Sequence, residues 1–284
     1  MTTEELIAAR RAEPWREALR KSKKNKERTD IPRVEMNELD AEYRSHTRLE
    51  EVNLGLTKEQ AMQEAQRCLD CPNPTCMQGC PVSINIPTFV KNIERGEFLE
   101  AARVLKETSA LPAVCGRVCP QEKQCESKCI HLKMGKPAVA IGYLERFAAD
   151  YERESGNISV PEVAEKNGIK IAVVGSGPAG LSFAGDMAKR GYDVTVFEAL
   201  HEIGGVLKYG IPEFRLPNKI VDVEIEGLRK MGVKFMTNCI VGKTISYDDL
   251  HADGFKGIFA ASGAGASEST VGASFRNGSS SYKS

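Results

Sequence analysis

The sequence lacks three features that would place it in a common binding or membrane class. It has 39 Lys and Arg against 39 Asp and Glu, so it has no net charge of the kind usual in nucleic-acid or membrane-surface binders. No apolar run approaches the roughly 18 residues that can span a bilayer. The N-terminal stretch MTTEELIAARRAEPWREALRK is charged throughout and has no apolar signal-peptide segment. We therefore expect a cytoplasmic protein with no nucleic-acid and no membrane partner.

The remaining composition is that of a globular protein with more than one domain. The 284 residues are 41% hydrophobic and 27% charged, and a domain typically takes about 100–200 residues. Residues 1–55 form a polar N-terminal arm, with a basic run from Arg16 to Arg28. We interpret this run as a solvated helix or loose arm. Docking onto a partner is the alternative.

Residues 56–155 are predicted to form a small helical domain around cysteines. Thr57 and Gln60 make a capping box for a helix that leads into Cys68. Further helices are expected after Pro87, from Phe98 to about Leu105, and over Ile141–Tyr151.

Strand and helix patterns alternate over residues 168–265. The apolar run Ile169–Gly175 and the segments Asp193–Glu198 and Gly257–Ser262 are predicted strands, with helices between them. This alternation predicts an α/β domain with a parallel sheet, and residues 156–167 form the linker. The fold class is therefore α+β multidomain. Residues 266–284 are rich in Ser and Gly and are predicted to be a disordered tail.

Cysteine is the most informative residue type. Eight of the nine cysteines fall into two groups, Cys68-x2-Cys71-x4-Cys76-x3-Cys80-Pro and Cys115-x3-Cys119-Pro-x4-Cys125-x3-Cys129. Thiolates match the charge and softness of iron–sulfur clusters, and a cysteine before proline can reach a second cluster. Structural zinc is the alternative, but it prefers paired C-x2-C knuckles, and only one such pair is present. The spacing fits two [4Fe–4S] clusters. Cys239 stands apart and is interpreted as a small core residue.

A dinucleotide-binding pattern follows the first predicted strand of the α/β domain. Its residues are Gly175, Ser176, Gly177, Pro178, Ala179 and Gly180, which have the G-x-G-x-x-G form. Between a strand and a helix, such glycines let the backbone approach a pyrophosphate at a helix N-terminus. Glu198 ends the next strand, where a carboxylate can accept hydrogen bonds from a ribose. Gly204 and Gly205 form either an ordinary turn or a second approach to a long cofactor, which favours FAD over NAD.

These motifs, in this order, resemble the small (beta) subunit of NADPH-dependent glutamate synthase. The resemblance lies in the cysteine groups, then VVGSGPAG, then VFEALHEIGGVLKYGIPEFRLP. The same module resembles the N-terminal part of dihydropyrimidine dehydrogenase and the large subunit of NADH-dependent ferredoxin:NADP oxidoreductase. It implies an N-terminal α-helical [4Fe–4S] domain, then a Rossmann-like FAD-binding domain of the glutathione-reductase type.

The resemblance also implies a ligand set for each of two clusters. The first cluster takes Cys68, Cys71, Cys76 and Cys129. The second takes Cys80, Cys119, Cys125 and, as a non-cysteine ligand, Glu145 of the I-G-x-L-x-x-F stretch. Cys115 is then a bystander. The alternative for Glu145 is a solvated acid on a helix.

The flavin site of the family corresponds to Gly175–Gly180, Glu198, Gly205, Arg215 and backbone near Val241. Arg215 is alternatively an exposed loop residue. The resemblance implies that NADPH reduces FAD, and that electrons pass through the clusters to a glutamate synthase large-subunit-like or other flavoprotein partner. It also allows for an oligomer.

The sequence departs from the family after Gly265. There the family continues into an NADPH-binding domain, whose second glycine-rich loop is not found here. We therefore expect an incomplete FAD domain, in a truncated chain or in a short electron carrier with a native tail. No catalytic residue is assigned.

Overall fold

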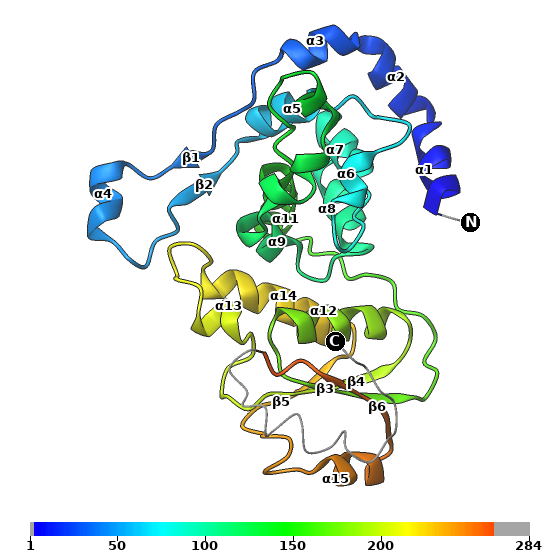
Figure 1. The fold of residues 1–284 in the computed structure, drawn as a ribbon, viewed down its shortest axis with the longest axis vertical. Coiled ribbons are helices and arrows are strands. Elements are labelled where there is room, and N and C mark those ends of the chain that lie inside the picture. Colours follow the sequence, from blue (N-terminus) through cyan, green and yellow to red (C-terminus); the bar gives the residue numbers. More distant parts are fainter. Residues whose placement is uncertain (1–2, 264–284) are drawn as a thin grey trace, which may run out of the picture. The chain divides into compact units, whose positions relative to one another are not determined.

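The computed structural model describes residues 3–263, which form two compact units (Figure 1). Within the described residues, the first unit comprises residues 3–161 and 212–220, and the second comprises 162–211 and 221–263. The division at residues 161 and 162 falls inside the predicted linker. The predicted tail 266–284 lies outside the described residues. None of the helices in the described part of the chain is long and apolar enough to cross a membrane.

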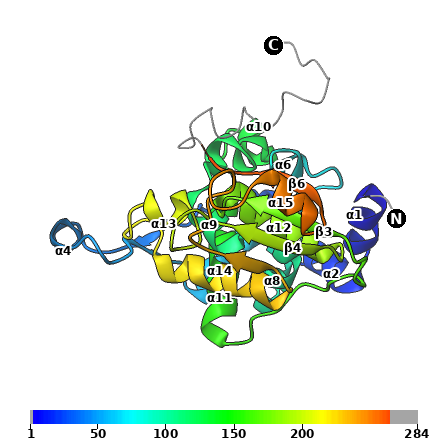
Figure 2. The same ribbon diagram turned by 90° about the horizontal axis from the view of Figure 1, so that it is seen from below.

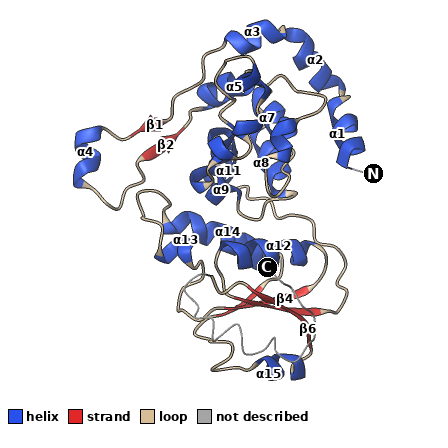
Figure 3. Cartoon of the chain, viewed as in Figure 1, coloured by secondary structure: helices blue, strands red, loops and turns tan. Residues whose placement is uncertain are grey.

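The first unit is mostly helical (Figure 3). Its elements, in order, are α1 (Thr3–Arg11), α2 (Pro14–Ser22), α3 (Asn25–Asp30), β1 (Asn37–Glu38), α4 (Ala41–His46), β2 (Asn53–Gly55), α5 (Lys58–Gln66), α6 (Thr75–Gln78), α7 (Ile86–Glu94), α8 (Phe98–Lys106), α9 (Pro112–Val118), α10 (Ile130–Lys133) and α11 (Ile141–Ser155). Two 3₁₀ turns, η1 (Gln121–Lys123) and η2 (Glu126–Lys128), lie between α9 and α10.

Local sequence signals account for several of these helices. Thr57 caps α5 by accepting a hydrogen bond from the Gln60 backbone, and the Gln60 side chain accepts one from the Thr57 backbone. Pro87 lies in the first turn of α7, whose residues are all buried. Phe98 of α8 packs edge-on against Phe147 of α11, with ring centroids 5.0 Å apart. The core of this unit therefore lies between α5, α7, α8 and α11.

The N-terminal segment differs from the expected solvated arm. Arg16 and Arg28 are each only 1% exposed. Each pairs with a distant carboxylate, Arg16 with Asp70 and Arg28 with Glu94. Charge density alone did not reveal these partners, because they lie more than 50 positions away in sequence. The antiparallel pair β1–β2 was also missed, and with α4 it extends away from the other helices of this unit (Figures 1 and 2).

The second unit is an α/β unit with a four-stranded sheet in the order β5-β4-β3-β6. Its strands are β3 (Lys170–Val174), β4 (Asp193–Phe197), β5 (Lys234–Met236) and β6 (Phe255–Ala260), and its helices are α12 (Pro178–Lys189), α13 (Val206–Tyr209) and α15 (Tyr247–Ala252). Helix α14 (Asn218–Lys230) begins in the segment 212–220 of the first unit. All strand pairs are parallel, which confirms the prediction of a parallel sheet. The carboxyl ends of the strands therefore share one edge, where α/β folds bind ligands.

Candidate cysteine and dinucleotide sites

The first unit brings four distant cysteines to one pocket. They come from the end of α5, the turn after it, α6 and the end of η2, and they are Cys68, Cys71, Cys76 and Cys129. The pocket is small, with a cavity volume of about 30 Å³. The residues around it are otherwise mainly apolar, such as Val90 and Ile141. These four cysteines are the ligand set that the family resemblance implies for one cluster.

A second group forms around Glu145 of α11, which is 5% exposed. Burial and then the Glu145 carboxylate raise the pKa of the Cys125 thiol to about 12. Burial, followed by Glu145 and Cys119, also raises the pKa of Cys80. Glu145 is therefore close to the cysteines of the second predicted set. Its burial argues against a solvated helix acid.

Cys115 belongs to this neighbourhood as well, which the sequence spacing did not reveal. Its thiol hydrogen-bonds to Cys119 and lowers the pKa of Cys119 to about 7. The same bond, with burial, raises the pKa of Cys115 well above the usual value of 9.0. Cys115 therefore favours the thiolate of Cys119.

His131 is a further residue that sequence reasoning missed. It is 1% exposed and lines the pocket of the first cysteine group. Its Nε2 lies 3.0 Å from the Arg67 carbonyl oxygen, so this nitrogen carries the hydrogen. Its Nδ1 is buried and has no hydrogen-bond partner among the described residues.

The chemistry of the thiols fits a bound metal centre. Burial raises the pKa of Cys68 to about 11, so a bare thiolate is disfavoured there and needs a positive partner. Among residues 3–263, no three His, Cys, Asp or Glu side chains converge closely enough to hold a single metal ion.

The second unit has a cleft of about 890 Å³ at the carboxyl ends of β3, β4 and β6. Most of the predicted nucleotide-binding residues line it, namely Gly175, Ser176, Gly177, Pro178, Ala179, Glu198, Gly205 and Val241. The N-terminus of the 12-residue helix α12 also opens here, at Gly177. The cleft can therefore hold an elongated ligand with an anionic group at the helix end.

Gly180 and Gly177 differ in the physical reason for which each position is a glycine. A Cβ on Gly180 would lie 2.0 Å from the Gly175 carbonyl oxygen, so packing within the loop excludes a side chain. A Cβ on Gly177 would meet no protein atom within 4 Å. Gly177 also has φ −67° and ψ −179°, which any residue can adopt. Neither packing nor backbone conformation requires glycine at Gly177, which leaves close approach of a ligand as its reason.

Glu198 is 6% exposed and braces the glycine loop. One carboxylate oxygen accepts hydrogen bonds from the Ser176 backbone N–H, at 2.8 Å, and from the Ser176 hydroxyl. The other accepts from the Leu200 N–H at 2.9 Å. The Ser176 hydroxyl oxygen in turn accepts from the Gly204 N–H, so these two loops are joined at the cleft. The oxygen that accepts from Leu200 has a second lone pair, so it can still accept a hydrogen bond from a ribose.

Three predicted residues need separate mention. Gly180 is buried behind the loop and is not among the residues that line the cleft. Arg215 lies in the segment 212–220 and is also not among the lining residues, so its role stays a prediction. Cys239, which was interpreted as a small core residue, is partly buried and packs against the core around Phe197 and Val241, and it also lines the cleft.

Comparison with known proteins identifies both units by family. Residues 44–157 match dihydropyrimidine dehydrogenase domain II, 4Fe-4S cluster. Residues 173–231 match the NAD(P)-binding Rossmann-like domain. The two matches define a 4Fe-4S cluster domain followed by an NAD(P)-binding Rossmann-like domain.

Particular relatives then confirm the resemblance read from the motifs. The NAD-dependent dihydropyrimidine dehydrogenase subunit PreT of Escherichia coli (strain K12) is 40% identical over 205 residues, covering 72% of this chain and 49% of the relative. The glutamate synthase [NADPH] small chain of the same organism is 40% identical over 195 residues, covering 68% and 41%. That of Azospirillum brasilense is 35% identical over 200 residues, covering 70% and 42%. The chain is homologous to these subunits, and it spans about half the length of the curated relatives it matches.

Proposed function

We propose that this chain is the flavin and iron–sulfur part of an electron-transferring oxidoreductase of the glutamate synthase small-subunit type. The observation that carries the proposal is the gathering of Cys68, Cys71, Cys76 and Cys129 around one pocket. These residues come from two cysteine groups that are separated by the two helices α7 and α8, and the fold brings them together as a cluster requires. The nucleotide cleft of the second unit supplies the other half of such a module.

Two [4Fe–4S] clusters are proposed, with separate ligand sets. The first is held by the four cysteines of the pocket. The second is held by Cys80, Cys119, Cys125 and Glu145, and its support is the mutual electrostatic influence of these groups. Cys115 stays outside both sets and assists Cys119.

FAD is proposed as the ligand of the nucleotide cleft. Gly177 leaves room for a pyrophosphate, and Glu198 can accept a hydrogen bond from the ribose. A Cβ on Gly205 would lie 2.8 Å from the Gly177 Cα, which brings a second glycine loop against the first. This second loop supports a ligand longer than one nucleotide. When bound, a flavin accepts two electrons as a hydride and can pass them on one at a time to iron–sulfur clusters.

The electron donor and the electron acceptor are proposed from the similarity to the relatives named above. NADPH is the proposed electron source, although its own glycine-rich loop is not found in these 284 residues. A glutamate synthase large-subunit-like protein is the proposed acceptor, for glutamate synthesis. A second candidate is a pyrimidine-reducing partner, because relatives of equal identity are named dihydropyrimidine dehydrogenase subunits.

The deciding experiment is anaerobic purification, with iron, sulfide and flavin measured on one sample. About eight irons and eight sulfides per chain support two clusters. One FAD per chain supports the assignment of the cleft. Zinc, or no metal, would overturn the cluster proposal. Clusters without FAD would restrict the function to the first unit. Mixing the reduced protein with each candidate acceptor then separates the two partner classes.

A further inference from the structure

We propose that buried cations from the N-terminal helices and α7 provide the counter-charge for the cluster at Cys68, Cys71, Cys76 and Cys129, and make it the more easily reduced of the two clusters. This inference rests on the proposed function, because it presupposes both clusters. It gives a role to the basic run from Arg16 to Arg28, which takes no part in either site described above.

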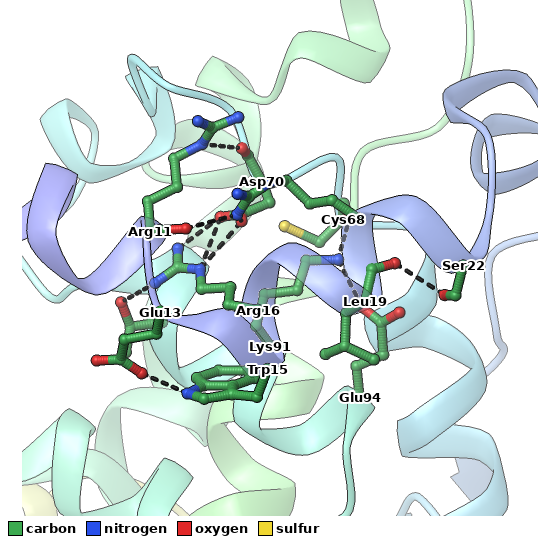
Figure 4. A network of polar contacts seen from close by, with 12 residues as sticks. Arg11, Glu13, Trp15, Arg16, Leu19, Ser22, Cys68, Asp70, Lys91 and Glu94 are labelled. Carbon is green, nitrogen blue, oxygen red and sulfur yellow. Dashed lines mark hydrogen bonds and ion pairs between the residues drawn. The ribbon is translucent and has the colours of Figure 1, made fainter.

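The contacts converge on Asp70, which lies between Cys68 and Cys71 (Figure 4). Asp70 is fully buried and has the left-handed backbone conformation, φ 51°. Its carboxylate accepts from the Arg16 Nη2 at 2.5 Å and from the single Nε–H of Arg16, which is shared between both oxygens at 3.0 and 3.1 Å. It also accepts from Arg20 at 2.7 Å. The Arg11 guanidinium donates to the Asp70 carbonyl oxygen at 2.9 Å. Helices α1 and α2 therefore hold the turn that carries two proposed ligands.

A second cation approaches the same turn from α7. The Lys91 ammonium donates to the Cys68 carbonyl oxygen at 2.6 Å and pairs with Glu94 (Figure 4). Glu94 also pairs with Arg28 of α3 at 2.8 Å. Lys91 is 0% exposed. A buried ammonium beside a cysteine backbone is costly unless negative charge lies nearby.

This network of ion pairs has a net positive charge. Its ion pairs join four cations, Arg16, Arg20, Arg28 and Lys91, to only two carboxylates, Asp70 and Glu94. The Arg11 guanidinium on the Asp70 carbonyl oxygen is a further cation. Buried charges are normally paired, so the surplus needs a negative partner close at hand. A [4Fe–4S] cluster with four thiolates carries net negative charge and supplies that partner. The surplus is thus explained by the group that the adjacent cysteines are proposed to hold.

The described charges that act on the second cysteine group give no comparable positive surplus. Glu145 and Glu126 act on Cys125, but Glu145 is itself a proposed ligand and takes the place of a thiolate, so it adds no charge to the surroundings. Glu126 is neutralised by Arg33 through a 2.8 Å ion pair. Reduction adds an electron, so nearby positive charge raises a cluster's potential and negative charge lowers it. The two clusters are therefore expected to be reduced in sequence, the Cys68 cluster first.

The test is a double-mutant cycle on the buried ion pair between Arg16 and Asp70, carried out in the 284-residue chain. Arg16→Gln removes a cation, Asp70→Asn removes a carboxylate, and the double variant restores the original net charge. Lys21→Gln is the control, because Lys21 lies on the same helix but its side chain is 76% exposed. For each variant, iron and sulfide content and an EPR-monitored redox titration are recorded.

The expected shifts have opposite signs. At a fixed applied potential, Arg16→Gln lowers the reduced-to-oxidised ratio of the higher-potential cluster about tenfold, equal to 59 mV for one electron. Asp70→Asn raises this ratio, while the double variant and Lys21→Gln stay near the parent protein. The lower-potential cluster moves less in every variant.

Three results would overturn the inference. Equal movement in one direction for both single variants would indicate structural disturbance of the turn. Unchanged potentials in fully loaded variants would refute the electrostatic role and leave the proposed function standing. A parent protein without clusters would refute the proposed function, and the inference with it.

Discussion

At the scale of single residues, a substitution at Gly177 should weaken ligand binding without destabilising the fold. Gly177→Ala adds a methyl group that meets no protein atom and needs no change in backbone conformation. With flavin removed from both proteins, we expect its free energy of unfolding to stay within about 1 kcal/mol of the parent value. Flavin content should fall at least about tenfold, a loss of about 1.4 kcal/mol in binding, because the methyl enters the cleft. Thermal melts and flavin absorbance measure the two effects.

The matched variant is Gly180→Ala, three positions along the same loop. Its methyl would lie 2.0 Å from the Gly175 carbonyl oxygen. Overpacking of this kind costs about 1–3 kcal/mol. Stability should therefore fall for Gly180→Ala and not for Gly177→Ala. Equal stability losses would contradict the ligand explanation of Gly177.

Glu145 offers a second test at the residue scale. As the proposed oxygen ligand of one cluster, Glu145→Ala should reduce the iron content from about eight to about four per chain. Glu145→Cys should restore it, because a thiolate can replace the carboxylate as a ligand. Glu154→Ala is the control, since that acid lies on the same helix with its side chain 68% exposed. Full iron content in Glu145→Ala would remove Glu145 from the ligand set.

At the scale of elements, the cap of α5 links local sequence to the cysteine site, since this helix ends just before Cys68. Thr57→Ala removes the side-chain acceptor for the Gln60 N–H and should destabilise the first unit by about 1 kcal/mol. Gln63→Ala, at an exposed position of the same helix, should have almost no effect. Urea unfolding followed by circular dichroism measures both. A cost for Gln63→Ala equal to that of Thr57→Ala would show that the cap is not the cause.

The same scale explains which elements could be predicted from the sequence. Helices such as α5 and α7 carry capping or proline signals in their own residues, and β3 and β4 are apolar runs next to turns. The burial of Arg16 could not be predicted, because it depends on Asp70, which is distant in sequence and was hidden inside a cysteine motif. The two-residue strand β1 is too short to give a periodic pattern.

The sites show the same division between local and long-range information. The cysteine spacing and the glycine loop are local, so their chemistry could be inferred from sequence. The pairing of Cys129 with Cys68 came only through the family resemblance, because spacing does not say which groups meet in space. His131 was missed, and the position of Cys239 in the cleft was not predicted, because single residues of these types have no motif.

At the scale of the whole molecule, the two compact units have separate hydrophobic cores. The core of the first includes proposed cluster ligands, because Cys68, Cys76, Cys80 and Cys129 pack against it. One core of the second is built from residues such as Phe197, Val241 and Phe255 and contains no proposed iron ligand. Iron should therefore stabilise one unit and not the other.

Calorimetry of the full chain should show two transitions, one for each unit. Removing iron with a chelator under anaerobic reducing conditions should lower the midpoint of the first-unit transition by more than about 10 °C, because metal binding free energy contributes to folding. The second-unit transition should stay within about 2 °C, as its core loses no contact. Thr57→Ala, which removes the cap of α5 in the first unit, assigns the transitions, because it should lower the midpoint of the first-unit transition alone. If iron removal lowers both midpoints equally, the units unfold together and the metal stabilises the whole chain.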